Sequence, residues 1–263
     1  MPNFSTSLHH HVLKVTLGLV VALVSQVLSA GVVIDGSRQI YPEHRREITV
    51  RLTNDDQTAP RLVKAWLDNG GSDQSPETSD VPFSLSPPVF RLDSGKSQVM
   101  RLSYTRQPLP ADRESVFWLN VLEVPPSANE FDPALEEGNR NQLRFAFRIR
   151  TKVFFRPAGL PGTPEGAHEQ LRWTLDRNAK EPALVVHNPS AYHVTFNDVA
   201  LAMGAAPGAK KVAVDSGMVE PRATLRLPVR QALPRVPADA QVDFAYINDF
   251  GAFSAPIRAA LQR

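Results

Sequence analysis

Residues 141–157 read NQLRFAFRIRTKVFFRP, and this stretch alternates apolar and basic residues along its length. Successive side chains of a strand point to opposite faces, so one face would be largely apolar and the other would carry five Arg and Lys residues. The apolar face would hold Leu143, Phe145, Phe147, Ile149, Thr151, Val153 and Phe155. At about 3.3 Å per residue, residues 143–155 would span roughly 40 Å, whereas strands average about 5 to 6 residues.

Two interpretations of this long strand are open. It is an ordinary core strand with a solvated basic face, or its apolar row is offered to another protein. The second interpretation has a physical basis, because an edge strand carries unpaired backbone groups that can pair with a second chain. The alternating pattern by itself favours neither.

The composition predicts a folded protein built from short strands. The 263 residues are 42% apolar and 21% charged, which suits one or two globular domains. Short runs of Val, Thr, Phe and Leu lie between 23 prolines and 14 glycines, as in antiparallel β proteins. There is no cysteine, so the fold must be held by core burial without disulfides.

The first thirty residues have the pattern of an export signal. Lys14 is their only charged residue, residues 15–28 are nearly all apolar, and Ser29, Ala30 and Gly31 are small. We therefore expect a signal peptide at 1–30, cut near Ala30. The alternative is an uncleaved membrane anchor, but the apolar run is short for a bilayer.

A break in the pattern after residue 155 predicts a domain boundary. The sequence RPAGLPG at 156–162 ends the long strand with prolines and glycines. We place a first domain at 31–157 and a second at 158–263, where short strands recur at intervals of about 8 to 12 residues, as in a second antiparallel sandwich. Trp66, in the strand RLVKAWLDN, is predicted to anchor the first core.

The sequence carries no recognisable catalytic or metal-binding pattern. It has no nucleotide loop and no serine elbow, and the four histidines beyond the leader are scattered. Asp112 and Glu114 could form an acid–base pair, although DRES is more typical of a turn with a structural ion pair. With 29 Lys and Arg against 27 Asp and Glu, nucleic-acid binding has no basis. We expect no enzyme activity, no cofactor and no metal.

Six motifs in order resemble the periplasmic pilus-assembly chaperones of the chaperone-usher pathway. The resemblance covers residues 31–256. The motifs are SRQIYP, PFSLSPPVFRLDSG, LPADRESVFWLNVLEVPP, LRFAFRIRTKVFFRPAGL, HNPSAYHVTF and YINDFGA.

The resemblance implies an all-β fold of two immunoglobulin-like sandwiches in an angled, L-shaped arrangement with a cleft between them. In this family the chaperone lends a strand to an incomplete pilus subunit, a form of β-augmentation. The inserted row would be Leu143, Phe145, Phe147 and Ile149. The family usually has aliphatic residues in this row, so the two phenylalanines suggest wider pockets in the cognate subunits.

The resemblance also assigns charged residues. Arg38 and Lys152 would bind the C-terminal carboxylate of the subunit. Glu114, Arg156 and Asp249 would form a charge network between the domains. The partners implied are pilus subunits and an outer-membrane usher in the periplasm, with a self-dimer of the free protein through its exposed strand.

The loop before the long strand and the cysteine content bear on the subclass and on the alternative function. The acidic loop at 127–140 lacks the cysteine pair of the family's long-loop class, so we expect a short-loop member. The alternative function, a pilus component or carbohydrate-binding adhesin, is disfavoured because the chain shows no N-terminal donor extension and no cysteine pair.

Overall fold

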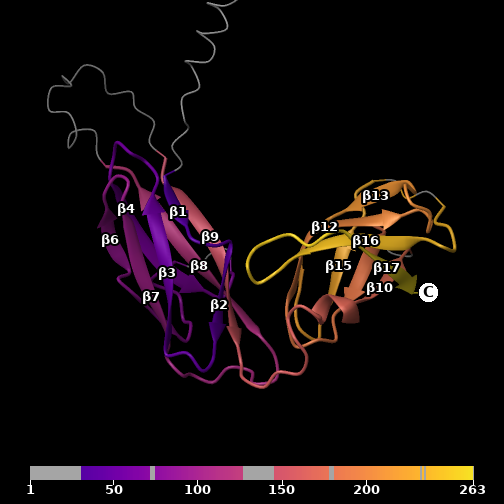
Figure 1. Cartoon of the computed structure of the whole chain (residues 1–263), viewed down its shortest axis with the longest axis horizontal. Coiled ribbons are helices and arrows are strands. Elements are labelled where there is room, and N and C mark those ends of the chain that lie inside the picture. Colours follow the sequence, from indigo (N-terminus) through magenta and orange to yellow (C-terminus); the bar gives the residue numbers. More distant parts are fainter. Residues whose placement is uncertain are drawn as a thin grey trace, which may run out of the picture.

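The computed structural model describes residues 31–71, 75–126, 145–177, 181–231, 233 and 235–262. These residues form two β domains set at an angle and joined after β9 (Figure 1). The predicted fold class is therefore confirmed. Within these residues the single helical segment is the 3-10 turn η1 (Ala167–Gln170), and no helix is long and apolar enough to span a membrane. The predicted signal peptide, the acidic loop and Leu143 lie outside the described residues.

The first domain consists of two facing sheets. Their strand orders are β1-β3-β7-β5 and β2-β9-β8-β4-β6. The strands are β1 (Val32–Ile34), β2 (Arg38–Pro42), β3 (Glu47–Asn54), β4 (Arg61–Asp68), β5 (Phe83–Ser86), β6 (Val89–Leu92), β7 (Ser97–Tyr104), β8 (Ser115–Val124) and β9 (Phe147–Arg156). Alternate apolar residues from both sheets fill the core between them, including Val50, Leu52, Met100, Leu102, Leu119, Val121, Val153 and Phe155.

The first edge strand of this domain is divided between the two sheets. β1 pairs antiparallel with β3, whereas β2 pairs parallel with β9, so the chain crosses over between them. Gly36 makes the crossing with a φ of 82°, in the left-handed region that glycine adopts most readily. The β2 pairing covers only Lys152–Arg156 of β9. Within the part of the chain that is described, Phe147–Thr151 therefore has no strand on that side.

The strand predicted at residues 143–155 is shorter in the structure. β9 begins at Phe147, and Phe145 and Ala146 precede it without strand pairing. The inward row is confirmed where β9 crosses the core, since Thr151, Val153 and Phe155 are buried. Near the start of β9 the row lies outside the core, and Phe147 is 57% exposed.

The second domain wraps one continuous sheet around its core. Its strands are β10 (Arg172–Asp176), β11 (Ala183–His187), β12 (Val194–Ala202), β13 (Lys211–Val214), β14 (Met218–Val219), β15 (Thr224–Pro228), β16 (Gln241–Ile247) and β17 (Ile257–Gln262). β17 closes the two layers, because it pairs antiparallel with β16 and then parallel with β10.

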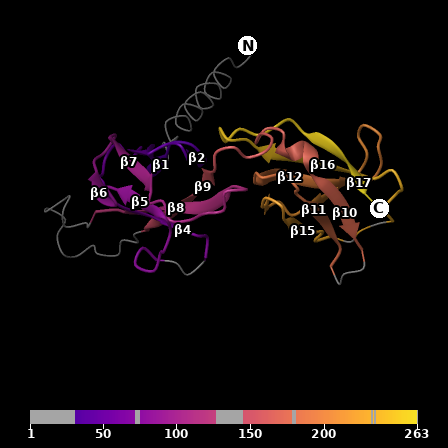
Figure 2. The same ribbon diagram turned by 90° about the horizontal axis from the view of Figure 1, so that it is seen from below.

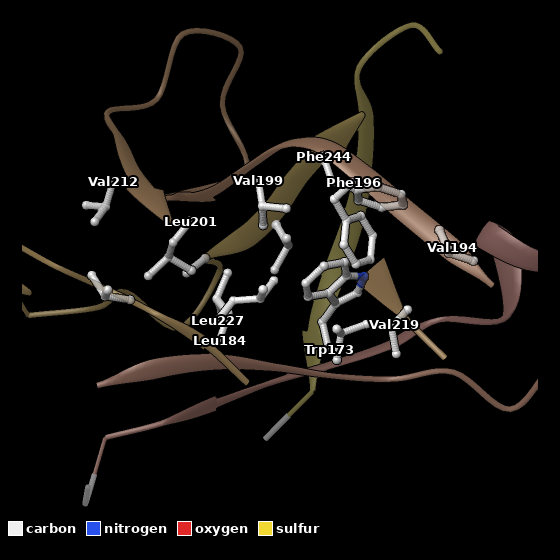
Figure 3. Packing of buried hydrophobic residues seen from close by; sticks show 14 of the residues in the cluster. Trp173, Leu184, Val194, Phe196, Val199, Leu201, Val212, Val219, Leu227 and Phe244 are labelled. Atoms are coloured by element: carbon white, nitrogen blue, oxygen red, sulfur yellow. The ribbon is translucent and has the colours of Figure 1, made fainter. Parts of the chain in front are cut away.

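Trp173 lies at the centre of the second core (Figure 3). Its ring is fully buried, with centroids 5.3 Å from Phe196 and 5.4 Å from Phe244. The two domains have separate hydrophobic cores, and they lie side by side in the perpendicular view as well (Figure 2).

The buried hydroxyl of Tyr41 gives a test of how β2 is held. Its oxygen donates to the Arg46 carbonyl at 2.9 Å and accepts from the Tyr104 N–H at 3.0 Å. Tyr41→Phe should lower the free energy of unfolding by about 1 to 2 kcal/mol, because the Tyr104 N–H loses this acceptor. Urea denaturation measures the change. Tyr246→Phe is the control, since that hydroxyl makes no hydrogen bond to the described residues. Equal stability of the wild type and Tyr41→Phe would contradict the stabilising role of the Tyr41 hydroxyl.

Candidate functional site

Arg38 and Lys152 lie side by side at the cleft between the domains. They face each other in the parallel β2–β9 pairing. Arg38 Nη1 donates to the Ile247 carbonyl of the second domain at 3.1 Å, and its Nε is buried without a partner among the described residues. Lys152 Nζ lies 5.2 Å from the centre of the Trp118 ring. The structure thus brings together the two cations predicted to bind a carboxylate.

The surroundings of this pair leave its positive charge poorly compensated. Burial lowers the pKa of the Lys152 ammonium, and the neighbouring charge of Arg38 lowers it further. Burial also lowers the pKa of the Arg38 guanidinium, against the opposing effect of Asp249. An anion bound between the two side chains would favour both charged forms. The pair is therefore suited to a carboxylate.

Both domains contribute to the pocket beside Arg38. Among the described residues, the first domain supplies Glu114 and Phe154 to its wall, and the second supplies His168, His193 and Tyr246. Phe154 belongs to the predicted basic face of the long strand, but it is buried because its ring packs against His193, with centroids 5.3 Å apart. The cleft therefore depends on the angle between the domains.

Arg156 links the two domains through two carboxylates. Its Nε donates to Glu114 Oε1 at 2.7 Å, and its Nη1 donates to Asp249 Oδ2 at 2.7 Å. Nη2 adds a second hydrogen bond to Asp249 at 3.1 Å. The structure brings together all three residues of the predicted charge network.

His193 is a member of this network that the sequence did not identify. Its backbone N–H donates to Glu114 Oε2 at 2.8 Å, and its Nδ1 lies 3.1 Å from the same oxygen. Burial favours the neutral form of Glu114, but the hydrogen bonds from His193 and the charge of Arg156 outweigh it and hold the pKa of that carboxyl below its usual range. His193 stands in the motif HNPSAYHVTF, although nothing in the motif shows which domain it contacts.

A second ion pair crosses between the domains at Asp112. Its carboxylate accepts from Arg222 Nη1, and its backbone carbonyl accepts from Arg222 Nη2 at 3.1 Å. Arg222 has a φ of 56°, an uncommon conformation for a residue other than glycine. Asp112 and Glu114 therefore contact different residues of the second domain, as expected for structural ion pairs rather than an acid–base pair.

The predicted partner-binding row lies at the start of β9. Phe145 and Phe147 are 58% and 57% exposed, with ring centroids 6.2 Å apart. Ile149 is half-buried against the core. The exposed rings thus lie beside the unpaired part of the β9 edge.

The basic face of β9 is ordered by aromatic and acidic residues that the sequence did not identify. Asp68 is fully buried and accepts from Arg148 at 3.1 Å and from Arg150 at 3.0 Å. The Arg148 guanidinium stacks on Trp66 and that of Arg150 on Trp118, each 4.8 Å from the ring centre. The prediction that Trp66 anchors the core is wrong, because its side chain lies on this outer face.

The described residues contain no group of three or more His, Cys, Asp and Glu side chains that could hold a metal ion. The site consists instead of cations, an apolar row and an open strand edge. Such features suit a protein that binds an extended segment of another chain by strand addition.

The chain belongs to the pilus-assembly chaperone family. Residues 31–161 match the family model described as pili and flagellar-assembly chaperone, PapD N-terminal domain, and residues 166–257 match that of the PapD C-terminal domain. The resemblance inferred from the six motifs is confirmed. The family is one of chaperones and not of enzymes.

Relatives and solved structures agree with this assignment. The chain is 39% identical over 223 residues to the probable fimbrial chaperone YadV of Escherichia coli K12, covering 84% of this chain and 87% of that protein. The crystal structure of the Pseudomonas aeruginosa CupB2 chaperone matches with a TM-score of 0.69 and 34% identity, over 88% of this chain and 100% of that one. A structure of the Salmonella enterica SafA pilin in complex with the SafB chaperone matches with a TM-score of 0.69 and 26% identity, over 90% and 99% of the two chains.

The Glu114 network predicts a defined pH dependence. Glu114→Gln should lower the free energy of unfolding by about 2 to 3 kcal/mol at pH 7, because it removes a charge-assisted contact from a buried site. The folded-state pKa of Glu114 is lowered, so its stabilisation is complete above the unfolded pKa of about 4.3 and is lost as pH falls through the folded value.

Chemical denaturation between pH 7 and pH 3 measures this difference. The difference in free energy of unfolding between wild type and Glu114→Gln should stay constant down to about pH 4.3 and become smaller below it. The control Glu47→Gln alters a surface pair 4.0 Å long with Arg101 and should cost less than about 0.5 kcal/mol throughout. An unchanged difference in free energy of unfolding at pH 3 would argue against stabilisation by ionised Glu114.

Proposed function

We propose that this protein is a periplasmic chaperone that binds pilus subunits by lending them strand β9. The observation that carries the proposal is the half-open edge of β9, with exposed phenylalanines at one end and the Arg38–Lys152 pair at the other. A subunit that lacks its last strand would pair its backbone with this edge and bury the phenylalanines in its groove.

The cation pair would fix the position of the subunit on β9. A C-terminal carboxylate between Arg38 and Lys152 gains charge-assisted hydrogen bonds from both. Phe147 lies five residues before Lys152, which is roughly 16 Å along the strand. Since a slip of one residue would turn the whole apolar row to the opposite face, an anchored end selects one register.

The charge network would hold the cleft in the shape that the subunit needs. Arg156 joins a carboxylate of each domain, and Arg38 reaches the Ile247 carbonyl across the cleft. An ion network of this kind can add little net stability and still fix an orientation. The Asp112–Arg222 pair supports the same angle.

The leader-like sequence at residues 1–30 and the family membership support a periplasmic setting. In this proposal residues 1–30 direct export, and the mature protein has domains at 31–157 and 158–263. The bound subunit is handed to an outer-membrane usher. No ATP is needed, because folding energy stored in the subunit is released when strands exchange. The free protein self-associates through the β9 edge, whose apolar side chains would otherwise face water.

Lys152→Glu tests the carboxylate anchor. The substitution places a negative charge beside the bound carboxylate, so the subunit recovered with the chaperone should fall at least about tenfold. The measurement is co-purification from periplasm of a tagged chaperone co-expressed with pilus subunits from its own operon. Lys96→Glu, on an exposed turn, makes the same change of charge and should leave recovery unaltered. Equal recovery with wild type and Lys152→Glu would exclude the anchor.

Phe147→Leu tests the fit of the apolar row. A leucine buries less surface, so affinity for the cognate subunit should fall by roughly 1 kcal/mol, or about fivefold. Because Phe147 is largely exposed in the single chain, the free energy of unfolding of the monomer should not change. Titration calorimetry with refolding subunit gives the affinity and urea denaturation gives the stability. If the leucine variant binds equally well, the cognate groove has no pocket sized for phenylalanine.

A further inference from the structure

Glu123 is a buried carboxylate whose charge has no cationic partner among the described residues. It lies near the end of β8 with 5% of its surface exposed, opposite Val63 of β4 and Phe147 of β9. Its one hydrogen bond within that part of the chain comes from the backbone N–H of Val32. Arg61 on β4 is not available to it, because Arg61 pairs with Asp56 at 2.6 Å. A buried charge is costly unless a second charge compensates it.

Gly31 lies directly against this carboxylate. A Cβ built on Gly31 would overlap both carboxylate oxygens of Glu123. A side chain at this position would require the Glu123 carboxylate to move away. The backbone nitrogen of Gly31 is about 2.5 Å from where that Cβ would stand, so it lies within about 5 Å of the carboxylate. The carbonyl of Gly31 accepts from the Asp55 N–H at 3.0 Å, which fixes the residue from its other side.

We propose that Gly31 is the N-terminal residue of the working protein and that its α-ammonium group forms an ion pair with Glu123. Hydrolysis of the Ala30–Gly31 peptide bond by an export peptidase adds the OH of water to the Ala30 carbonyl, which leaves as a carboxylate. The freed Gly31 nitrogen becomes an amine that is protonated at neutral pH, since α-amino groups have a pKa of about 7.7 to 8.0. The cut therefore creates the cation that the buried carboxylate requires.

This ion pair would join the two sheets of the first domain. Gly31 precedes β1 in one sheet, and Glu123 belongs to β8 in the other. In the uncut chain the same nitrogen is a neutral amide and cannot neutralise the carboxylate. Removal of the leader would therefore stabilise the end of the sandwich at which β9 starts. The cleavage position and the fold are coupled, because a cut one residue away would move the ammonium group off Glu123.

The first experiment identifies the N-terminus and titrates its amine. The full chain is exported to the periplasm, purified and weighed by mass spectrometry, with a mass beginning at Gly31 expected. The Cα chemical shift of Gly31 is then followed by NMR from pH 6 to pH 10. The amine should titrate at a higher pH in wild type than in Glu123→Gln, because the carboxylate favours the ammonium form. Glu77→Gln removes an exposed carboxylate paired with Lys64 and should titrate like wild type.

A second experiment keeps Glu123 intact, so it tests the ion pair even if Glu123→Gln does not fold. A version that starts at Ala30 is produced in the cytosol and compared with the processed protein in urea at pH 7. The version starting at Ala30 should unfold at lower urea concentration. A mature N-terminus other than Gly31, identical amine titration in wild type and Glu123→Gln, or equal stability of the two N-terminal forms would each overturn the proposal.

Discussion

The division of the first edge strand between two sheets is the constraint on which the site depends. Because β1 pairs with β3 and β2 pairs with β9, the described strands cover only the C-terminal half of β9 on this side. In its N-terminal half, a row of backbone groups has no strand partner on this side among the described residues and can pair with water or another chain. The same crossing places Arg38 opposite Lys152 at the point where the cover begins. The β2–β9 register therefore determines both where the open edge ends and which two cations lie opposite each other.

The basic residues of β9 show how a strand can be held firmly and still offer a charge. Arg148 and Arg150 share the buried carboxylate of Asp68, and Arg156 bridges Glu114 and Asp249. Lys152 lies between these groups and has no ion pair among the described residues. The neighbouring pairs fix the strand on both sides of Lys152, so its ammonium is positioned by contacts that do not consume its charge. This arrangement is preorganised for an anion.

The sequence predicted those parts that depend on local pattern and on motif order. The alternation in β9, the all-β architecture and the family follow from residues that are close in the chain. The contacts of Asp68, Trp66 and His193 could not be predicted in this way, because each depends on the registers that bring β4, β8 and β9 together or on the angle between domains. Trp66 was misassigned for that reason: an aromatic ring in a strand favours a core position, but here it lies under an arginine on the outer face. The start of β9 was also misplaced, since an alternating pattern does not show where pairing with β8 begins.

The placement of the three tryptophans has a spectroscopic consequence. Trp66 and Trp118 lie under the guanidinium groups of β9, whereas Trp173 is sealed in the second core. Indole emission depends on the charge and solvent around the ring, so the first two report on strand β9 and the third on the integrity of the second domain. Replacing Trp173 by phenylalanine would leave a chain whose tryptophan fluorescence comes from Trp66 and Trp118 alone. The emission of that chain would report on the basic face of β9 with no attached dye.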